Sequence, residues 1–525
     1  MKEILTPREA VEFIRDGAAL ALGGFGSYCG PDALLEALRQ RYTETETPRG
    51  LTIVTGISTG DNTLEDRGMN RIAMEGLVDT AIVGHFANAP KFSALAGGNV
   101  IAAYTLPLGV MVHLFRAAAG KKPGVFTKVG LGTFADPRNE GCKGNARAVR
   151  QGRDVVELLD INGEEVLFYP TIPLDICLLR GTYADEDGNI SIEHEGLTGS
   201  ELEIAAAVHN HSGTVIVQVE DIVRRGSIHP RKVRIHGSLV DYVVKTPSPD
   251  LHMQNYATSV YLPALTGELR CVTKGIEPMK MGLRKIIARR GAMELIPGCV
   301  INLGIGIPSG VGIIANEEGI AATLSLESGP IGGVPLEGTG FAGSMNPENI
   351  NSICDTFDLY DGGFLDMTFL GAAEIDERGN VNVSKFGNRC PGPGGFINIS
   401  QNTPKVFFMG GFTAGKQRIE VTGGKLNIIE DGPKMKFIKE VQQITFSADY
   451  ARGMGQEVTY ITERAVFRLT GSGIMLTEIA PGVELERDIL AHMGFCPLIA
   501  EDLKVMDGRI FREGKMGLEN DRAGV

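Results

Sequence analysis

Two landmarks occur twice in this chain, in the same order. The first is an apolar run that ends in glycines, at residues 16–26 and again at residues 297–307. The second is an acidic turn that ends in Gly-Asn, at residues 184–191 and again at residues 375–382. Each apolar run lies between two stretches with helical periodicity. A strand between helices that ends in glycines is typical of an open parallel α/β sheet, so the repeat predicts two related α/β halves.

The two predicted halves differ in length between their landmarks. The first copy is about 90 residues longer, which indicates an insertion. Prolines and mixed polarity at residues 246–275 predict a linker, with one half at residues 1–245 and the other at residues 276–525. We expect an antiparallel β-rich extension on the second half. The strand-like runs of that extension are residues 425–429, 458–461, 465–469 and 474–479.

Composition and charge limit the class of protein. The 525 residues are 43% hydrophobic and 22% charged, as in globular enzymes of several domains. A net charge of -13 argues against a nucleic-acid partner, which needs a basic surface. No apolar run has the length of a signal peptide core or a membrane helix, so we expect a cytoplasmic protein with no membrane partner. The eight cysteines form no Cys-x-x-Cys pair, and we expect reduced thiols and no metal.

One carboxylate stands at a position that needs an explanation. Residues 323–327 predict a short strand that ends in Glu327, and small residues follow it. In open α/β sheets the reactive groups lie beyond the carboxyl ends of the strands, where small residues let a ligand approach. A glutamate there could attack a thioester. The alternative is a surface glutamate that closes a strand.

The chain resembles the family I coenzyme A transferases over nearly its whole length. Within that family it is most similar to the bacterial propionate and acetate CoA-transferase group. The matching segments are residues 23–26, 122–130, 132–139, 180–185, 302–306, 327–335, 394–399 and 459–464. The resemblance implies two Rossmann-like halves, the second carrying the catalytic glutamate, and a homo-oligomer, dimer or tetramer.

The family mechanism implies roles for particular residues. Glu327 matches the nucleophile, which receives coenzyme A as a glutamyl-CoA thioester while CoA passes from a short-chain acyl-CoA to a short-chain carboxylate. Kinetics should be ping-pong, with CoA as a co-substrate and no cofactor. By resemblance, the Gly394-Gly395 segment supplies an oxyanion-stabilising amide, for which Gly395 is the candidate. The expected substrate- and CoA-facing loops contain Gly304, Ile305 and Gly306 in the second half and Gly23, Gly24, Phe25 and Gly26 in the first.

Leu108 departs from the family pattern. Many relatives have glutamine at this place, where its amide can bond the nucleophile or the substrate carboxylate. Either another polar group compensates, or the pocket favours a different acyl group, so acetate, propionate, butyrate and lactate all stay open.

Three other hypotheses about the function stay open. They are a non-catalytic acyl-CoA sensor on the same fold, an acyl-CoA thioester hydrolase and, more weakly, a nicotinamide-dependent enzyme.

Overall fold

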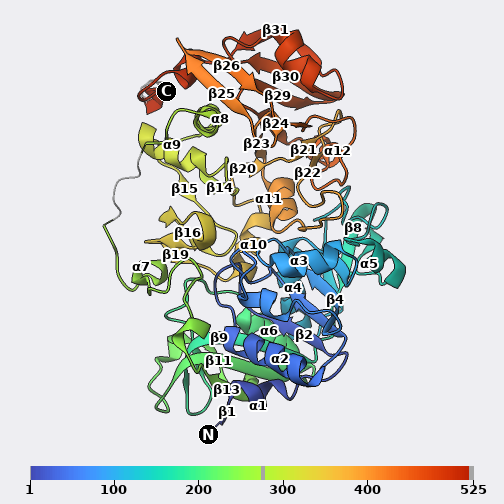
Figure 1. The fold of residues 1–525 in the computed structure, drawn as a ribbon, viewed down its shortest axis with the longest axis vertical. Coiled ribbons are helices and arrows are strands. Elements are labelled where there is room, and N and C mark those ends of the chain that lie inside the picture. The colour runs from blue at the N-terminus through green and yellow to red at the C-terminus, as the bar shows by residue number, and fades with distance from the viewer. Residues whose placement is uncertain (1, 273–277, 520–525) are drawn as a thin grey trace. The chain divides into compact units, whose positions relative to one another are not determined.

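The computed structural model describes residues 2–272 and 278–519, and the chain divides into two compact units (Figure 1). Unit 1 consists of the described residues within Met1–Cys271, with Glu327–Asp358 and Ser384–Asn398. Unit 2 consists of those within Val272–Leu326, Leu359–Val383 and Ile399–Val525. The expected linker, residues 246–275, contains the first passage between the units, and residues 273–275 lie outside the described part. Glu327, expected in the second half, belongs to unit 1 by its contacts.

Unit 1 is built on a sheet whose main strands are all parallel. In spatial order these strands are β1 (Glu3–Leu5), β13 (Tyr242–Lys245), β11 (Thr214–Val223), β9 (Ile176–Asp185), β2 (Ala19–Leu22), β3 (Leu51–Thr55), β4 (Val78–Val83) and β5 (Ala102–Thr105). Two short strands, β10 (Ile190–Ser191) and β12 (Val233–Ile235), pair antiparallel at its margin. The parallel order places the carboxyl ends of β2, β3, β4 and β5 at one edge.

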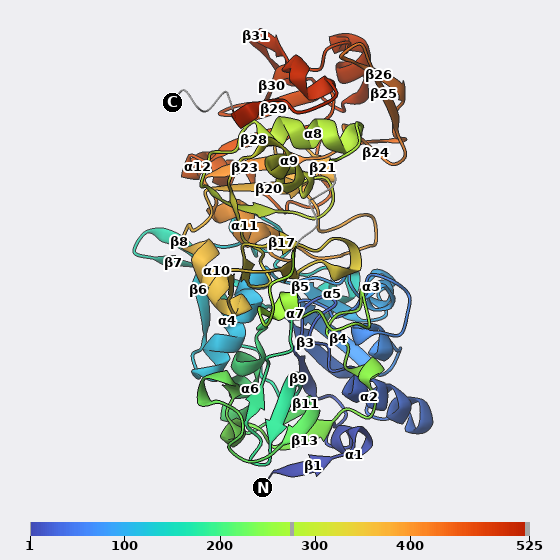
Figure 2. The same cartoon turned by 90° about the vertical axis from the view of Figure 1, so that its left-hand side faces the viewer.

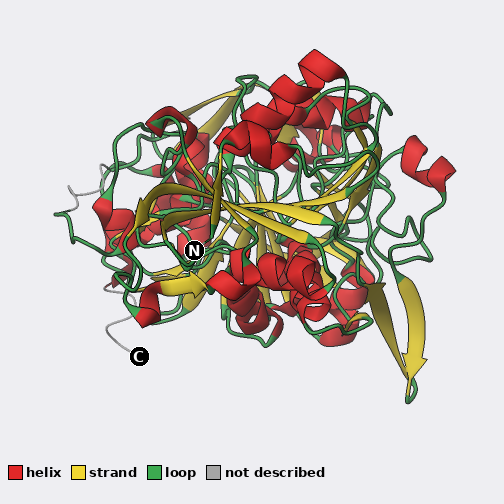
Figure 3. Cartoon of the chain, turned by 90° about the horizontal axis from the view of Figure 1, so that it is seen from below, coloured by secondary structure: helices red, strands yellow, loops and turns green. Residues whose placement is uncertain are grey.

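Helices cover both sides of the strands, as Figure 3 shows with helices in red and strands in yellow. The helices of unit 1 are α1 (Pro7–Val11), α2 (Asp32–Thr45), α3 (Pro90–Gly97), α4 (Leu108–Ala119), α5 (Ala146–Gln151), α6 (Glu201–Asn210) and α7 (Pro263–Thr266). Two further helices, α10 (Ile353–Asp361) and α11 (Phe396–Asn402), begin in unit 1 and end in unit 2. Leu20 of β2, Leu34 of α2 and Ile53 of β3 are completely buried in one apolar cluster. Burial of these side chains is the main force that fixes the helices on the sheet.

The extra length of the first half builds two kinds of structure. Strands β4 and β5 extend the parallel sheet beyond β3. A separate antiparallel sheet follows, with the order β6 (Gly124–Thr127), β8 (Glu164–Pro170) and β7 (Glu157–Ile161). The β7–β8 hairpin projects from unit 1 (Figure 2).

Unit 2 has its own sheet, which is parallel on one side and mainly antiparallel on the other. Its order is β15 (Thr323–Leu324), β14 (Val300–Leu303), β20 (Met367–Gly371), β23 (Lys405–Met409), β28 (Glu457–Ile461), β29 (Ala465–Thr470), β30 (Gly473–Ile479) and β31 (Leu498–Val505). The pairs from β15 to β28 are parallel, those from β28 to β30 are antiparallel, and β31 is parallel to β30. This confirms the fold class, with two related open sheets and an antiparallel extension on the second.

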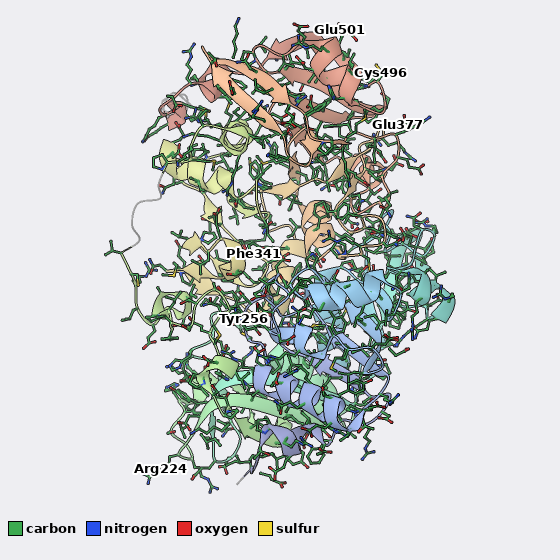
Figure 4. All side chains as sticks on the ribbon, in the orientation of Figure 1. Arg224, Tyr256, Phe341, Glu377, Cys496 and Glu501 are labelled. Carbon is green, nitrogen blue, oxygen red and sulfur yellow. The ribbon has the colours of Figure 1, made fainter. Side chains whose placement is uncertain are left out.

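Short elements complete the chain. Helices α8 (Leu283–Ala292), α9 (Gly310–Glu318) and α12 (Ala448–Met454) belong to unit 2. Its two-stranded pairs are β21 (Glu374–Ile375) with β22 (Val381–Asn382), β24 (Thr413–Ala414) with β27 (Lys434–Met435), and β25 (Arg418–Thr422) with β26 (Lys425–Glu430). In unit 1, β16 (Pro330–Ile331) pairs with β19 (Asn349–Ile350), and β17 (Val334–Pro335) with β18 (Ser344–Met345). Figure 4 labels Glu501 on the edge strand β31.

The acidic landmark is the same hairpin in both units. In unit 1, Asp185 Oδ1 accepts from the Asn189 amide at 3.0 Å, and Asp185 Oδ2 accepts from Asn189 Nδ2 at 3.0 Å. In unit 2, Asp376 makes the same two bonds to Asn380, at 2.9 and 3.0 Å. Glu377, labelled in Figure 4, lies in the second of these turns. The repeated bonding pattern confirms that the two halves are related.

None of the helices in residues 2–272 and 278–519 is both long and apolar enough to cross a membrane. Within the same ranges, no group of three or more His, Cys, Asp or Glu side chains could hold a metal ion. All eight cysteines are free thiols, and only Cys271 and Cys496 are exposed.

Candidate active site

Glu327 lies just past the end of a very short strand. The expected strand over residues 323–327 is only two residues long, because β15 ends at Leu324. Ser325 still donates its amide to Ile301 O at 2.9 Å, but its carbonyl accepts from Asn302 Nδ2 at 3.0 Å. The side-chain amide of Asn302 thus takes the place of a backbone amide of the β-ladder, and the strand ends here. Glu327 follows in a turn, so its backbone takes no part in the sheet.

The chain after Glu327 must turn within a narrow space. Gly329 has a φ of +125°, and a Cβ there would lie 2.2 Å from the carbonyl oxygen of Asn351. Only glycine fits both conditions. This turn leads into β16, which pairs with β19 and fixes the position of Glu327 from its C-terminal side.

The Gly394-Gly395 turn meets the Glu327 carboxylate. The backbone amide of Gly395 donates a hydrogen bond to Glu327. A Cβ at Gly395 would lie 1.9 Å from Glu327 Oε2, and Gly394 has a φ of +53°. The structure therefore brings together three predicted residues, and glycine allows the peptide nitrogen to reach the carboxylate.

The surroundings of Glu327 change its acidity. Burial among protein atoms raises the pKa of Glu327 to about 7, and the Gly395 amide opposes this by lowering it. Phe357 is completely buried, and its Cζ lies 3.0 Å from where a Gly395 Cβ would be. Burial also lowers the pKa of His85, a neighbour of Gly394, to about 4, so its imidazole is neutral at physiological pH. Near pH 7 the Glu327 carboxyl is poised between its two protonation states.

The ends of β4 and β5 hold this turn. Gly394 donates its amide to Gly84 O at 3.0 Å, and its carbonyl accepts from the Leu108 amide at 2.9 Å. Gly84 follows β4, and Leu108 begins α4 shortly after β5. The Leu108 side chain is completely buried, and its Cδ1 lies 3.2 Å from where a Gly56 Cβ would be. Leu108 thus joins the site through its backbone, which the sequence did not predict.

The first glycine loop lies at the same edge of the unit 1 sheet. Gly23, Gly24, Phe25 and Gly26 follow β2, which is separated from β4 by one strand. A Cβ at Gly24 would lie 2.6 Å from Thr59 Cγ2, and Gly24 has a φ of +96°. The Phe25 side chain is buried and packs inside unit 1.

The second glycine loop belongs to unit 2. Gly304, Ile305 and Gly306 follow β14, and Gly304 approaches the end of β20, where a Cβ would lie 3.3 Å from Phe369 O. A Cβ at Gly306 would have no neighbour within 4 Å, although its φ is +86°. Ile305 is 66% exposed. The loop around Gly306 is open, in contrast to the crowded Gly394-Gly395 turn. Its role in binding CoA stays a prediction.

The structure adds contacts of Gly84, Phe357 and Asn398, to which the sequence assigned no role. For Gly84 a signal was present, because residues 78–84 are an apolar run that ends in glycine, as at residues 16–26. Asn398 lies in the matching segment 394–399, but nothing in the sequence indicated its contact or that of Phe357, since each approaches Gly109 from more than 200 positions away in the chain.

Comparisons with known proteins agree with this geometry. The sequence profile of the family described as coenzyme A transferase matches residues 4–246. Caffeate CoA-transferase of Acetobacterium woodii is 44% identical over 99% of both chains. Acetate CoA-transferase YdiF of Escherichia coli K12 is 41% identical over 98% of this chain and 96% of that protein. The acyl-CoA transferase YdiF of E. coli O157:H7, in a thioester complex with CoA, superimposes with a TM-score of 0.91 at 40% identity, covering 98% and 97% of the two chains.

Proposed function

Because the chain belongs to the coenzyme A transferase family and is a CoA-transferase, we propose that it passes CoA from a short-chain acyl-CoA to a short-chain carboxylate through a thioester on Glu327. The observation that carries this proposal is the Gly395 amide directed at the Glu327 carboxylate. A carboxylate nucleophile keeps the energy of the thioester in covalent form, which transfer without hydrolysis requires.

The reaction proceeds in two covalent stages. The Glu327 carboxylate attacks the thioester carbonyl, the C–S bond breaks, and CoA leaves as a thiolate from a mixed anhydride. Loss of CoA leaves the acyl group joined to Glu327 as that mixed anhydride. The thiolate then attacks the Glu327 carbonyl carbon of the anhydride, and the donor acid leaves as a carboxylate. The glutamyl-CoA thioester remains, and an acceptor carboxylate reverses both steps. Every step uses Glu327, backbone amides and substrates, so the proposal requires no cofactor.

The Gly395 amide has its main role in the second step. When the thiolate attacks Glu327, negative charge develops on the glutamyl oxygen that accepts from this amide. A donor fixed at that oxygen stabilises the transition state more than the ground state, typically by a few kcal/mol. Gly394 contributes by the turn that presents the next peptide nitrogen.

The acyl group is proposed to be of acetate or propionate size. One relative is named for acetate and another for caffeate, so similar chains differ widely in acceptor. Phe357 and Leu108 are both completely buried beside the turn that contacts Glu327. Competition among acetate, propionate, butyrate, lactate and caffeate for one acyl-CoA donor tests this choice. A kcat/KM for caffeate above those of the short acids would overturn it.

The decisive experiment detects the covalent intermediate. The full-length protein is incubated with acetyl-CoA or propionyl-CoA, and peptide mass spectrometry searches for CoA on the peptide that contains Glu327. We expect the adduct in the wild type and its absence in Glu327→Ala. No adduct with any short acyl-CoA, while binding persists, would overturn the assignment. Turnover without an acceptor carboxylate would instead indicate a hydrolase.

Two further expectations complete the proposal. The family resemblance implies a homo-oligomer, dimer or tetramer, which light scattering on the full-length protein tests. The lack of an apolar run as long as a signal-peptide core or a membrane helix is the basis for a proposed cytoplasmic location, which fractionation of the producing cells tests.

A further inference from the structure

The first two amides of α4 bond the Gly394-Gly395 turn and the helix that follows it. The N–H groups at the start of a helix have no acceptor within it. Here the Leu108 amide donates to Gly394 O at 2.9 Å, and the Gly109 amide donates to Asn398 Oδ1 at 3.1 Å. Both acceptors lie within four residues of Gly395. The start of α4 is therefore bound to the segment that carries the Gly395 amide.

Asn398 is the one side chain in this set of contacts. It lies in the first turn of α11, three residues after Gly395, and it is completely buried. Its Oδ1 atom bonds an amide that is 289 positions away in the chain. A buried amide donor left without an acceptor destabilises the fold, so the Asn398 side chain restricts the position of Gly109.

The contact is also sterically tight. A Cβ at Gly109 would lie 2.3 Å from Asn398 Nδ2 and 2.7 Å from Phe357 Cδ1. The start of α4 thus approaches α11 as closely as glycine permits. Because α11 begins directly after Gly395, any shift between the two helices moves the Gly395 amide relative to Glu327.

We propose that Asn398 is a positioning residue for CoA transfer, which holds the Gly395 amide in line with the Glu327 carboxylate by accepting from Gly109. This inference rests on the proposed roles of Glu327 and Gly395. Asn398 does not itself touch the reacting atoms. Its effect is to restrict where the first turn of α11 can lie.

Two consequences distinguish positioning from simple stability. A displacement of about 1 Å at a reacting group can cost about 10²-fold in rate, so kcat should fall while KM changes little. The Gly395 amide also lowers the pKa of Glu327. If the Gly395 amide moves away, it no longer lowers the pKa of Glu327, and the acid limb of the pH–rate profile moves to higher pH.

The test compares three variants of the full-length protein. Asn398→Leu keeps the size but removes the acceptor, and Asn398→Asp restores an acceptor that also favours the helix N-terminus. Asn402→Leu is the matched control, because it removes an asparagine of the same helix whose Nδ2 donates to Asp361 Oδ1 at 3.0 Å. Steady-state kinetics with acetyl-CoA and propionate, thermal midpoints and pH profiles are measured for each.

For Asn398→Leu we expect kcat to fall about 10- to 100-fold, KM for acetyl-CoA to stay within about threefold, and the acid limb to move upward. Asn398→Asp and Asn402→Leu should stay within about threefold of the wild type. If Asn398→Leu does not fold, Asn398→Ser, whose hydroxyl is too short to reach Gly109, is judged by the same criteria.

Three outcomes would overturn the inference. They are an unchanged kcat in the folded variant, a lower kcat with an unmoved acid limb, and no rescue by Asn398→Asp. The CoA adduct of the wild type distinguishes a failure of this inference from a failure of the proposed function. If CoA is found on Glu327 and the Asn398 variants behave like the wild type, only the positioning role fails. If the wild type forms no adduct, the assignment of Glu327 fails first.

Discussion

The two related sheets begin alike and differ in how far they extend. In unit 1, β2 pairs with β9, and in unit 2, β14 pairs with β20. Each second strand leads into the same acidic hairpin. Beyond this shared part, the unit 1 sheet continues through β3, β4 and β5, whereas the unit 2 sheet ends with the two-residue β15. The added strands end beside Gly84 and Leu108, whose backbone groups hold Gly394. The extension of one repeat therefore supports the candidate active site.

Glycines at the strand ends show the same difference. A Cβ at Gly84, after β4, would lie 2.4 Å from the Gly56 carbonyl oxygen. A Cβ at Gly371, the last residue of β20, would have no neighbour within 4 Å. Gly84, whose carbonyl accepts from Gly394, is thus crowded by backbone, whereas Gly371 in the other sheet is open.

The largest effect is expected from Gly395→Ala. The added methyl group would occupy the place of Glu327 Oε2 and push the amide and the carboxylate apart. Loss of one oxyanion donor typically lowers kcat about 10²- to 10³-fold. Single-turnover kinetics with acetyl-CoA should show slow formation of the Glu327 adduct while the thermal midpoint falls only slightly. An adduct that forms at the wild-type rate would contradict the role of this amide.

Gly84→Ala should have a smaller effect through the support of the turn. The methyl group would strike a backbone oxygen, which cannot move as a side chain does, so we expect a destabilisation of about 1–3 kcal/mol. The Gly84 carbonyl that accepts from Gly394 would shift with it, lowering kcat about 10-fold. Thermal unfolding and steady-state kinetics measure both. Loss of stability with full kcat would show that β4 supports the fold and not the reaction.

The sequence predicted the repeated part better than the site. Strand-to-glycine runs and the Asp-Gly-Asn hairpins are local patterns, so the two sheets and the antiparallel extension could be read from them. Glu327 was placed at a strand end, but the strand is shorter because Asn302 bonds the Ser325 carbonyl. That bond joins residues 23 positions apart and has no signature in residue spacing.

Sequence patterns did not reveal the contacts that support the Gly394-Gly395 turn. Leu108 was selected for its side chain, in contrast to the glutamine of relatives, yet its backbone amide makes the contact to Gly394. A contact made by a backbone amide does not restrict the residue type at that position, so the sequence carries no sign of it. Asn398 bonds Gly109 across 289 positions, and only the folded chain shows that the two meet.

The rate should depend on pH through Glu327. Burial raises the pKa of this carboxyl from 4.5 to about 7, and only the carboxylate attacks. Activity should therefore be about tenfold lower at pH 6 than at pH 8. A kcat/KM profile over pH 5–9 measures the acid limb. A limb near pH 4.5 would mean that the free enzyme does not bury this group.

The same shift predicts a stability effect of opposite sign. A carboxyl whose pKa is raised on folding contributes stability that is present below pH 4.5 and is lost as the pH rises through about 7. Glu327→Gln, which cannot ionise, should therefore raise the stability of the folded state at pH 8 by on the order of 3 kcal/mol and change it little at pH 4.5. Thermal midpoints at the two pH values check this. Equal shifts at both would assign the effect to packing.

The smallest effect is expected from Gly371→Ala, which changes an uncrowded glycine at the end of a strand in the other sheet. Its site is open and its φ is not in the left-handed region, so alanine fits without strain. Removing a glycine lowers the conformational entropy of the unfolded chain, and stability should rise by about 0.4–1 kcal/mol. Activity should stay within about twofold of the wild type, because the added methyl group meets no neighbour within 4 Å. Thermal unfolding and steady-state kinetics, run beside Gly84→Ala, measure both. Equal losses of activity in the two alanine variants would show that crowding at the end of β4 is not the reason why this strand end matters for catalysis.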